Sequence, residues 1–192
     1  EDMLVESAAV ADAPAYEVVE TEPGAARMQD LHRRLGQAQA PVAIVGGSRW
    51  DEQAVARFAD FAARWQLPVA VSFRRQMLFP ADHDCYIGDV GLGINPQLRQ
   101  RLESADLILL VGGRMSEIPS QSYSLLDIPV PRQQLVHVHP DSSELGRVYR
   151  PALAIHASPA AFCAALADLA PPAQEPAWAE AKRAMRQAYL SW

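Results

Sequence analysis

Short, uninterrupted hydrophobic runs recur along the chain, and the segments between them place apolar residues at helical spacing. A run without alternation is typical of a strand that is buried on both faces of a parallel sheet. The runs that fit this pattern are 42–45 (VAIV), 69–72 (VAVS), 107–111 (LILLV), 134–138 (QLVHV) and the shorter 153–156. Strand, helix and strand in this order predict βαβ units, and therefore an α/β fold with a parallel sheet.

The segments between the strands carry signals for helix starts. Side chains that suit an N-cap precede three of them, and two of these caps are followed by proline at the first helical position. The caps and the helices that they open are Asp51 for 52–66, Asn95 for 96–103 and Ser158 for 159–169. A further helix is predicted over 28–39, and the three prolines within 116–133 predict an irregular connection.

Both ends of the chain differ from this pattern. Residues 1–25 are rich in Ala, Glu, Pro and Val without sustained periodicity, which predicts an extended linker. After the PPAQEP segment, residues 177–192 predict an amphipathic helix that carries Trp178, Tyr189 and Trp192. Such large apolar side chains need to be covered. We therefore expect a partner outside this chain, self-association through the tail, or disorder there.

Composition narrows the class of protein. The 192 residues carry a formal net charge of −6, and 49% of them are hydrophobic, as in an ordinary globular domain. The negative balance argues against nucleic acid or an anionic membrane as a partner, and the longest apolar run, 107–111, is too short to span a bilayer. The acidic start lacks the basic and apolar regions of a signal peptide, so we expect a cytoplasmic protein.

Rare residues exclude several kinds of chemistry. The single lysine, Lys182, lies in the predicted C-terminal helix, so neither a P-loop nor a Schiff-base lysine has a candidate. Cys85 and Cys163 are far apart and form no CxxC pair, which favours packing over a disulfide or a zinc site. No GxSxG or HExxH motif occurs. We therefore expect a binding module without catalytic residues of its own.

Three glycine turns follow predicted strands or precede predicted helices, at the edge where open parallel sheets bind ligands. The candidate contacts at this edge are Gly46, Gly47, Gly91, Gly93, Gly112, Gly113, Arg114 and Asp141. Glycine lets the backbone approach a phosphate, and an arginine can hold a phosphate through a bidentate pair. A carboxylate just past a strand can accept a hydrogen bond from ribose. Together these residues indicate a nucleotide site.

Each of these residues also has a purely structural interpretation. The glycines can serve only as tight turns, Arg114 as a surface cation or ion-pair partner, and Asp141 as the cap of a short helix. His137 and His139 alternate at a strand end, but no third ligand lies nearby in the sequence, so we interpret them as structural rather than metal-binding. The sequence leaves both interpretations of this edge open.

Four segments, in order and at consistent spacing, resemble the central domain of thiamine-diphosphate-dependent enzymes. They are PVAIVGGSRWDEQAVARFADFAARWQLPVAVSF, YIGDVGLGINP, ADLILLVGGRMSE and LVHVHPDSSELGRVY. The nearest likeness is to acetolactate-synthase-like members and related decarboxylases, and it covers roughly residues 25–170. It implies an interdomain linker over 1–25 and a central domain over 26–170, followed by a linker and C-terminal helix over 171–192 that lead to a further domain.

The resemblance implies a Rossmann-like, three-layer domain with a mostly parallel, about six-stranded sheet. Such domains bind FAD or ADP in some members of the family and are only structural in others. The glycines, Arg114 and Asp141 are then the nucleotide candidates. His139 stands where the flavin-containing pattern has an aspartate, which weakens the flavin interpretation because a neutral imidazole replaces a ribose-binding carboxylate. Asp141 still matches the second acid of that pattern.

In this family, thiamine diphosphate lies between a pyrimidine-binding and a pyrophosphate-binding domain, and a GDG motif followed by asparagines holds magnesium. The only Gly-Asp pair here is Gly88-Asp89, and the only asparagine is Asn95. The resemblance therefore implies a part of a homo-oligomeric enzyme that acts on 2-keto acids, with thiamine and magnesium bound by flanking domains.

Two alternatives come from other classes of protein. The first is a purely structural or oligomerisation domain without a bound nucleotide. The second, with less support, is a stand-alone NAD-binding Rossmann or sirtuin-like enzyme. The chain has neither the four-cysteine zinc pattern nor a GxGxxG turn after the first strand, so this second alternative is disfavoured.

Overall fold

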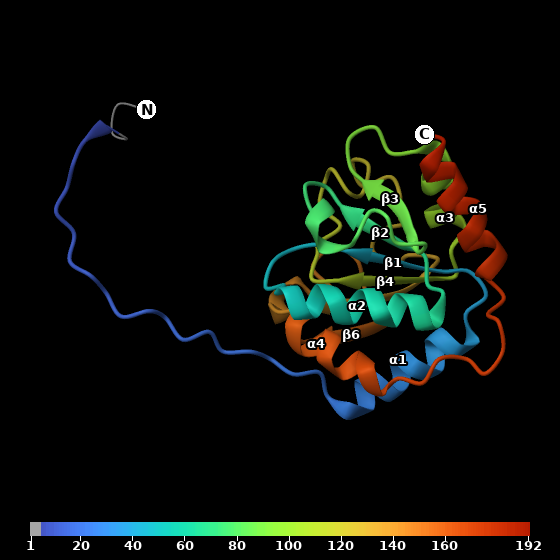
Figure 1. Cartoon of the computed structure of the whole chain (residues 1–192), viewed down its shortest axis with the longest axis horizontal. Helices are drawn as coiled ribbons and strands as arrows, with labels where there is room; N and C mark the ends of the chain where they lie inside the picture. Colours follow the sequence, from blue (N-terminus) through green and yellow to red (C-terminus); the bar gives the residue numbers. More distant parts are fainter. Residues whose placement is uncertain (1–4) are drawn as a thin grey trace.

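The computed structural model describes residues 5–192, and a six-stranded sheet forms the centre of this part of the chain (Figure 1). Neighbouring strands are parallel, in the order β3-β2-β1-β4-β5-β6. The strands are β1 (Pro41–Val45), β2 (Val69–Ser72), β3 (Tyr86–Val90), β4 (Leu107–Val111), β5 (Gln134–His139) and β6 (Leu153–His156). The predicted Rossmann-like α/β fold is confirmed.

Helices cover both faces of the sheet, which explains why the strands show no alternation. The helices are α1 (Ala25–Gln37), α2 (Glu52–Trp65), α3 (Pro96–Ser104), α4 (Pro159–Ala165) and α5 (Ala179–Leu190). α1, α2 and α4 pack on one face, whereas α3 and the irregular segment after β4 pack on the other (Figure 1). Within β4, Leu109 faces the first of these cores and Leu110 faces the second.

The three predicted helix caps are confirmed. Each side chain accepts a hydrogen bond from a free backbone N–H in the first turn of its helix. The bonds are Ala54 N to Asp51 at 2.6 Å, Gln97 N to Asn95 at 2.8 Å and Ala161 N to Ser158 at 3.1 Å. The capping side chains thus predict the first residue of a helix more accurately than the spacing of apolar residues does. For α1, which has no such cap, the apolar spacing predicts a start at residue 28, three residues after the observed one.

The hydrophobic pattern alone does not predict β3. Gly88 and Asp89 interrupt its apolar residues, and Gly88 has a φ of +119°. The register between β2 and β3 also shifts between Val69 and Val71. A bulged edge strand of this kind lacks the regular side-chain pattern on which sequence prediction depends.

The C-terminal helix packs on the domain itself, against β3 at the edge of the sheet (Figure 1). Trp178 is only 3% exposed, and its Nε1 donates to the backbone oxygen of Gln66 at 3.0 Å. Tyr189 meets Tyr86 edge to face, with ring centroids 4.8 Å apart. The expectation that these side chains need a partner outside the chain is therefore wrong. Trp192, in contrast, is 72% exposed.

Residues 6–24 form no helix or strand, and the first part of this segment extends away from the domain (Figure 1). Its end is attached at two points. The Arg49 guanidinium donates to the backbone oxygen of Val19 and to the Glu20 carboxylate, both at 2.8 Å. Ser158 N donates to the oxygen of Thr21 at 3.0 Å. Within the described part of the chain, no helix has the length and apolar character needed to cross a membrane.

Candidate functional site

The turns after β1 and β4 lie side by side at the carboxyl edge of the sheet. These two strands are neighbours, but the sheet grows toward β2 from one and toward β5 from the other. Ligands of open parallel sheets bind at such a switch point. A hollow of about 460 Å³ lies there, and its lining includes Gly47, Gly112, Arg114 and Asp141. Four of the eight candidates thus surround one hollow.

The glycines of these two turns are in contact with each other. A Cβ atom on Gly47 would lie 1.7 Å from the backbone oxygen of Gly112, and one on Gly112 would lie 2.7 Å from the oxygen of Gly46. Gly46 and Gly113 are also neighbours, because a Cβ atom added to either one would lie 3.3 Å from the Cα atom of the other. Gly47 and Gly112 also have φ values of +73°. The turns therefore need glycine in order to pack, whether or not a phosphate binds.

Two of the backbone donors at this edge already have partners. Gly46 N donates to the oxygen of Val111 at 3.0 Å, and Gly112 N donates to the oxygen of Val138 at 2.8 Å. The N-terminus of α2 is similarly engaged, because the Asp51 carboxylate accepts from its first turn. A ligand phosphate would therefore depend on side-chain cations more than on these N–H groups.

Arg114 is the one cation among the four predicted residues that line the hollow. Its side chain is 60% exposed, and it forms an ion pair with Glu144 at 3.4 Å. Glu144 makes a shorter contact of 2.7 Å with Arg147. A long, solvent-exposed ion pair contributes little stability, so Arg114 can turn toward a ligand anion while Glu144 keeps its better partner.

Asp141 caps a short 3₁₀ helix, Ser142–Glu144, at the rim of the hollow. One carboxylate oxygen accepts from Ser143 N at 2.9 Å and from Ser143 Oγ at 2.8 Å. These hydrogen bonds, the backbone one first, lower the pKa of Asp141, so that the carboxylate is charged at neutral pH. The structural interpretation is thus realised, and the second oxygen stays available to a ribose hydroxyl.

Gly91 and Gly93 lie in the turn after β3 and do not line the hollow. The backbone oxygen of Gly91 accepts from Gln121 Nε2 at 3.0 Å, which ties this turn to the segment after β4. Gly93 has a φ of +71°, and a Cβ atom added to it would meet nothing within 4 Å. The structure therefore separates these two candidates from the other six.

Two further arginines that were not among the predicted residues, Arg49 and Arg75, line the same hollow. Both come shortly after a strand, β1 and β2, so the rule that selected Arg114 also applies to them. Together with Arg114 they bring three guanidinium groups to the hollow, whose lining also includes the carboxylates of Asp141 and Glu144. Arg49 is already paired with the Glu20 carboxylate at 2.8 Å, so Arg75 and Arg114 are the cations that can turn toward a ligand.

His137 and His139 differ in their surroundings: His137 is buried in the sheet, whereas His139 lines the hollow at the glycine turns. His137 is buried and Nε2 lies 3.0 Å from the oxygen of Gly113; because a carbonyl only accepts, Nε2 carries the proton. Burial lowers the pKa of His137 to about 4, which keeps the ring neutral at physiological pH. Across residues 5–192 no group of three His, Cys, Asp or Glu side chains is arranged to hold a metal ion.

Both cysteines are buried and unpaired, in agreement with the predicted packing role. Cys85 directly precedes β3, and its Sγ is 3.4 Å from the backbone oxygen of Ala62. Burial raises the pKa of the Cys85 thiol to about 11 and that of Cys163 still further. Neither thiol is therefore poised for nucleophilic or metal chemistry at neutral pH.

Together, the parallel strand order and the helices on both faces of the sheet define a Rossmann-like α/β domain. Residues 28–166 match the family model described as "Thiamine pyrophosphate enzyme, central domain". The chain therefore belongs to this family, and the resemblance found in the sequence is confirmed.

Two curated relatives are enzymes of much greater length. The acetolactate synthase large subunit of Corynebacterium glutamicum is 26% identical over 137 residues, which cover 71% of this chain and 21% of that protein. Sulfoacetaldehyde acetyltransferase of Alcaligenes xylosoxydans xylosoxydans is 27% identical over 143 residues, 74% of this chain and 24% of that protein. The chain thus spans less than a quarter of each relative.

A solved structure shows the same fold. Benzoylformate decarboxylase from Polynucleobacter necessarius superposes with a TM-score of 0.63 at 18% sequence identity. The match covers 88% of this chain and 32% of that one. At this identity the likeness concerns the fold alone.

Proposed function

We propose that the chain acts as the central domain of a thiamine-diphosphate-dependent enzyme that acts on 2-keto acids. In this proposal, the thiamine diphosphate and magnesium are held by flanking pyrimidine- and pyrophosphate-binding domains of the same protein, in a cytoplasmic homo-oligomer. The family match over 28–166 and the enzyme relatives support the proposal.

The residues of this chain do not fit a thiamine–magnesium site. The one Gly-Asp pair, Gly88-Asp89, lies inside β3, and the only asparagine, Asn95, is engaged as the cap of α3. No step of thiamine chemistry is therefore assigned to these residues. We expect calorimetric titration of this chain with thiamine diphosphate and magnesium to give no saturable heat, and micromolar binding would contradict the assignment to flanking domains.

For the domain itself, we propose that the hollow at the glycine turns binds the diphosphate of an adenine nucleotide, ADP or FAD. The observation that carries this proposal is the convergence of Arg75 and Arg114 on one hollow at the switch point of the sheet. Guanidinium groups suit phosphate oxygens because they donate two parallel hydrogen bonds. The volume of about 460 Å³ is within the usual range for a ligand pocket.

Arg114 and Asp141 have separate tasks in this proposal. Arg114 exchanges its 3.4 Å contact with Glu144 for a phosphate oxygen. Asp141, held in place by Ser143, accepts from a ribose hydroxyl. The adenine and phosphate end of the nucleotide therefore supplies most of the affinity, which makes ADP a sufficient probe.

A purely structural domain is the second candidate, and one observation favours it. Close packing against each other and against Ser72 and Pro159 accounts for the glycines at the switch point, and Gly46 N and Gly112 N are engaged within the sheet edge. On this alternative, the arginines are surface cations and the hollow binds no nucleotide.

Titration of the chain with ADP and with FAD distinguishes the two candidates. The nucleotide proposal predicts saturable binding that Arg114→Ala weakens about tenfold to hundredfold, as expected for a charge-assisted hydrogen bond. Arg132→Ala is a matched control, because Arg132 pairs with Asp127 at an exposed site that does not line the hollow. No binding to the unmodified chain would favour the structural candidate, and equal binding to Arg114→Ala would show that Arg114 has another role.

A further inference from the structure

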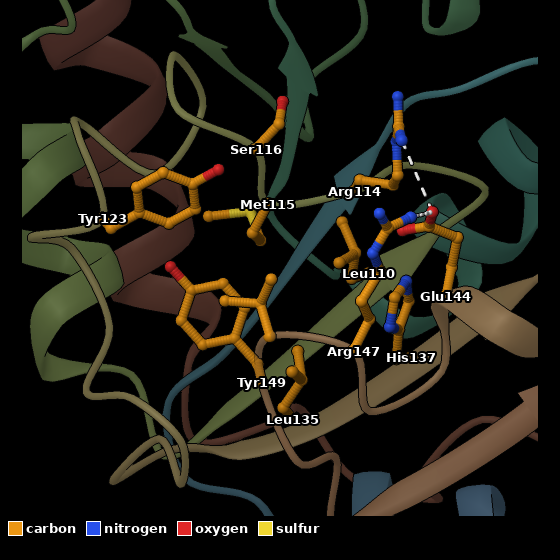
Figure 2. Close-up of a pocket in the computed structure, with 11 residues that line it drawn as sticks. Leu110, Arg114, Met115, Ser116, Tyr123, Leu135, His137, Glu144, Arg147 and Tyr149 are labelled. Atoms are coloured by element: carbon orange, nitrogen blue, oxygen red, sulfur yellow. Dashed lines mark hydrogen bonds and ion pairs between the residues drawn. The ribbon is translucent and has the colours of Figure 1, made fainter.

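A second hollow, of about 340 Å³, adjoins the hollow at the glycine turns and shares Arg114 and Glu144 with it (Figure 2). Leu110 of β4 and Leu135 of β5 line it, and both belong to the core on the α3 side of the sheet. Gly47 and Gly112 do not contribute to this lining. The second hollow therefore has its own walls, made of side chains rather than turn backbone.

The second hollow contains a buried polar group without a partner. Tyr149 is only 5% exposed, and within the described residues its hydroxyl forms no hydrogen bond of normal geometry, although the Ser120 hydroxyl lies close to it. Burial raises the pKa of Tyr149, and the nearby Ser120 hydroxyl lowers it to a smaller extent. A buried hydroxyl that lacks a partner is destabilising. The polar atom of a bound molecule would remove this cost.

An unusual turn places a second aromatic ring at the same hollow. Gln121, Ser122 and Tyr123 have φ values of +53°, +57° and +60°, in the left-handed region that non-glycine residues rarely adopt. Tyr123 lines the hollow on the side where Tyr149 and Met115 lie (Figure 2). Strained turns of this kind often hold side chains at ligand sites.

The opposite side of the hollow carries an excess of positive charge. Arg114 and Arg147 both donate to the same oxygen of Glu144, at 3.4 and 2.7 Å (Figure 2). Each guanidinium has five N–H donors, so these contacts leave most of them unused. His137 is neutral, because burial lowers its pKa, and adds no charge. Two cations and one carboxylate leave one net positive charge, which matches a monoanion.

We propose that this second hollow binds a small aromatic monocarboxylate. The apolar and tyrosine-lined side receives the ring, the Tyr149 hydroxyl meets a polar atom of the ligand, and Arg147 and Arg114 hold the carboxylate. An apolar cavity of about 150 Å³ already accommodates benzene, so the volume here suffices for a ring with a short acidic side chain. Because Arg114 borders both hollows, a bound nucleotide would compete for it, and the proposal concerns the chain without nucleotide.

Methyl NMR of the full chain with phenylacetate as the probe tests the proposal. With ¹³C-methyl methionine labelling, we expect the Met115 resonance to shift saturably, because Met115 lines the hollow. Met28, in α1 beside a different surface hollow, is the internal reference and is expected not to shift. The Met115→Leu variant assigns the resonance. An unchanged Met115 resonance, or a shift of Met28 instead, would overturn the proposal.

Two comparisons separate specific binding from general association. Phenylacetamide has the same ring without the charge, and we expect it to bind about fivefold more weakly or not at all. Tyr149→Phe and Arg147→Gln are expected to weaken phenylacetate binding about threefold to tenfold each, whereas Arg132→Gln leaves it unchanged. Equal shifts with the acid and the amide, or unaltered binding to both variants, would contradict the site.

Discussion

The turns after β1 and β4 and the turn after β3 all contain paired or near-paired glycines, yet the residues serve different purposes. At the central turns, glycine backbones are packed against each other, and any side chain would meet backbone atoms. At the edge turn, Gly93 faces open space and is needed only for its φ of +71°. Gly91, in the same edge turn, is close to side chains instead, because a Cβ atom there would lie 2.5 Å from Asp89 Oδ1. Contact between two glycine backbones is thus found at the switch point, whereas Gly93 at the edge is needed for its conformation.

The largest change in stability is expected when one glycine is replaced at each of the two kinds of turn. Gly47→Ala is expected to cost about 3–5 kcal/mol of unfolding free energy, because its Cβ would overlap the oxygen of Gly112. Gly93→Ala shares the positive φ but has free space, so it is expected to cost only about 1–2 kcal/mol. Denaturant unfolding measures both. Equal losses would show that conformation, not contact, sets the requirement at the central turns.

His137 supports the central turns from within the sheet, through the oxygen of Gly113. Because burial lowers its folded-state pKa from 6.5 to about 4, the unfolded chain takes up the proton first as the pH falls. The contribution of neutral His137 to the free energy of unfolding is therefore complete above about pH 6.5. It is lost as the pH falls toward 4, which lowers the free energy of unfolding by about 3 kcal/mol.

Denaturant unfolding between pH 7 and pH 4 tests this pH dependence. We expect His137→Gln to flatten the stability profile in that window, whereas His156→Gln, at an exposed position of β6, leaves it unaltered. A profile for His137→Gln that is as steep as the unmodified one would show that other groups cause the acid sensitivity.

Tyr149 tests whether the region beside the central turns is arranged for binding rather than for stability. Removal of its unpartnered hydroxyl in Tyr149→Phe is expected to raise the unfolding free energy of the ligand-free chain by about 1 kcal/mol. Thermal unfolding followed by circular dichroism measures the change. A loss of stability would reveal a hydrogen bond to this hydroxyl and would remove the main support for the second hollow.

The smallest effect is expected at Arg49, which attaches the segment before Ala25 to the turn after β1. Arg49→Ala removes the contacts with Val19 and Glu20 at the protein surface, so the global stability is expected to fall by less than about 1 kcal/mol. Limited proteolysis is expected to cut the segment before Ala25 faster, while 42–156 stays protected. An unaltered cleavage rate would show that Ser158 and Thr21 alone hold the segment.

Much of the fold follows from local rules. The strands after Pro41, Pro68 and Asp106 lie where the apolar runs place them, because burial on both faces leaves a continuous signal. The caps Asp51 and Asn95 mark helix starts to the residue. β3 and the docking of α5 could not be predicted in this way, because a bulged edge strand and a helix that covers it depend on contacts between distant residues.

The candidate site was predicted less completely than the fold. Arg114 and Asp141 lie at one hollow because both follow strands that end at the same edge. The sequence does not reveal that Asp141 is held by Ser143 or that Arg114 faces Glu144, since these contacts depend on the course of the loop after β5. The second hollow had no sequence signal, because its residues come from β4, β5 and two loops.

The most direct test of the central claim is a crystal structure of the chain grown with ADP. The account predicts the diphosphate between Arg114 and Arg75, above Gly47 and Gly112, with the ribose next to Asp141. An unfilled hollow at a saturating concentration of ADP, or ADP bound at another position, would contradict the claim that the switch point of this central domain is a nucleotide site.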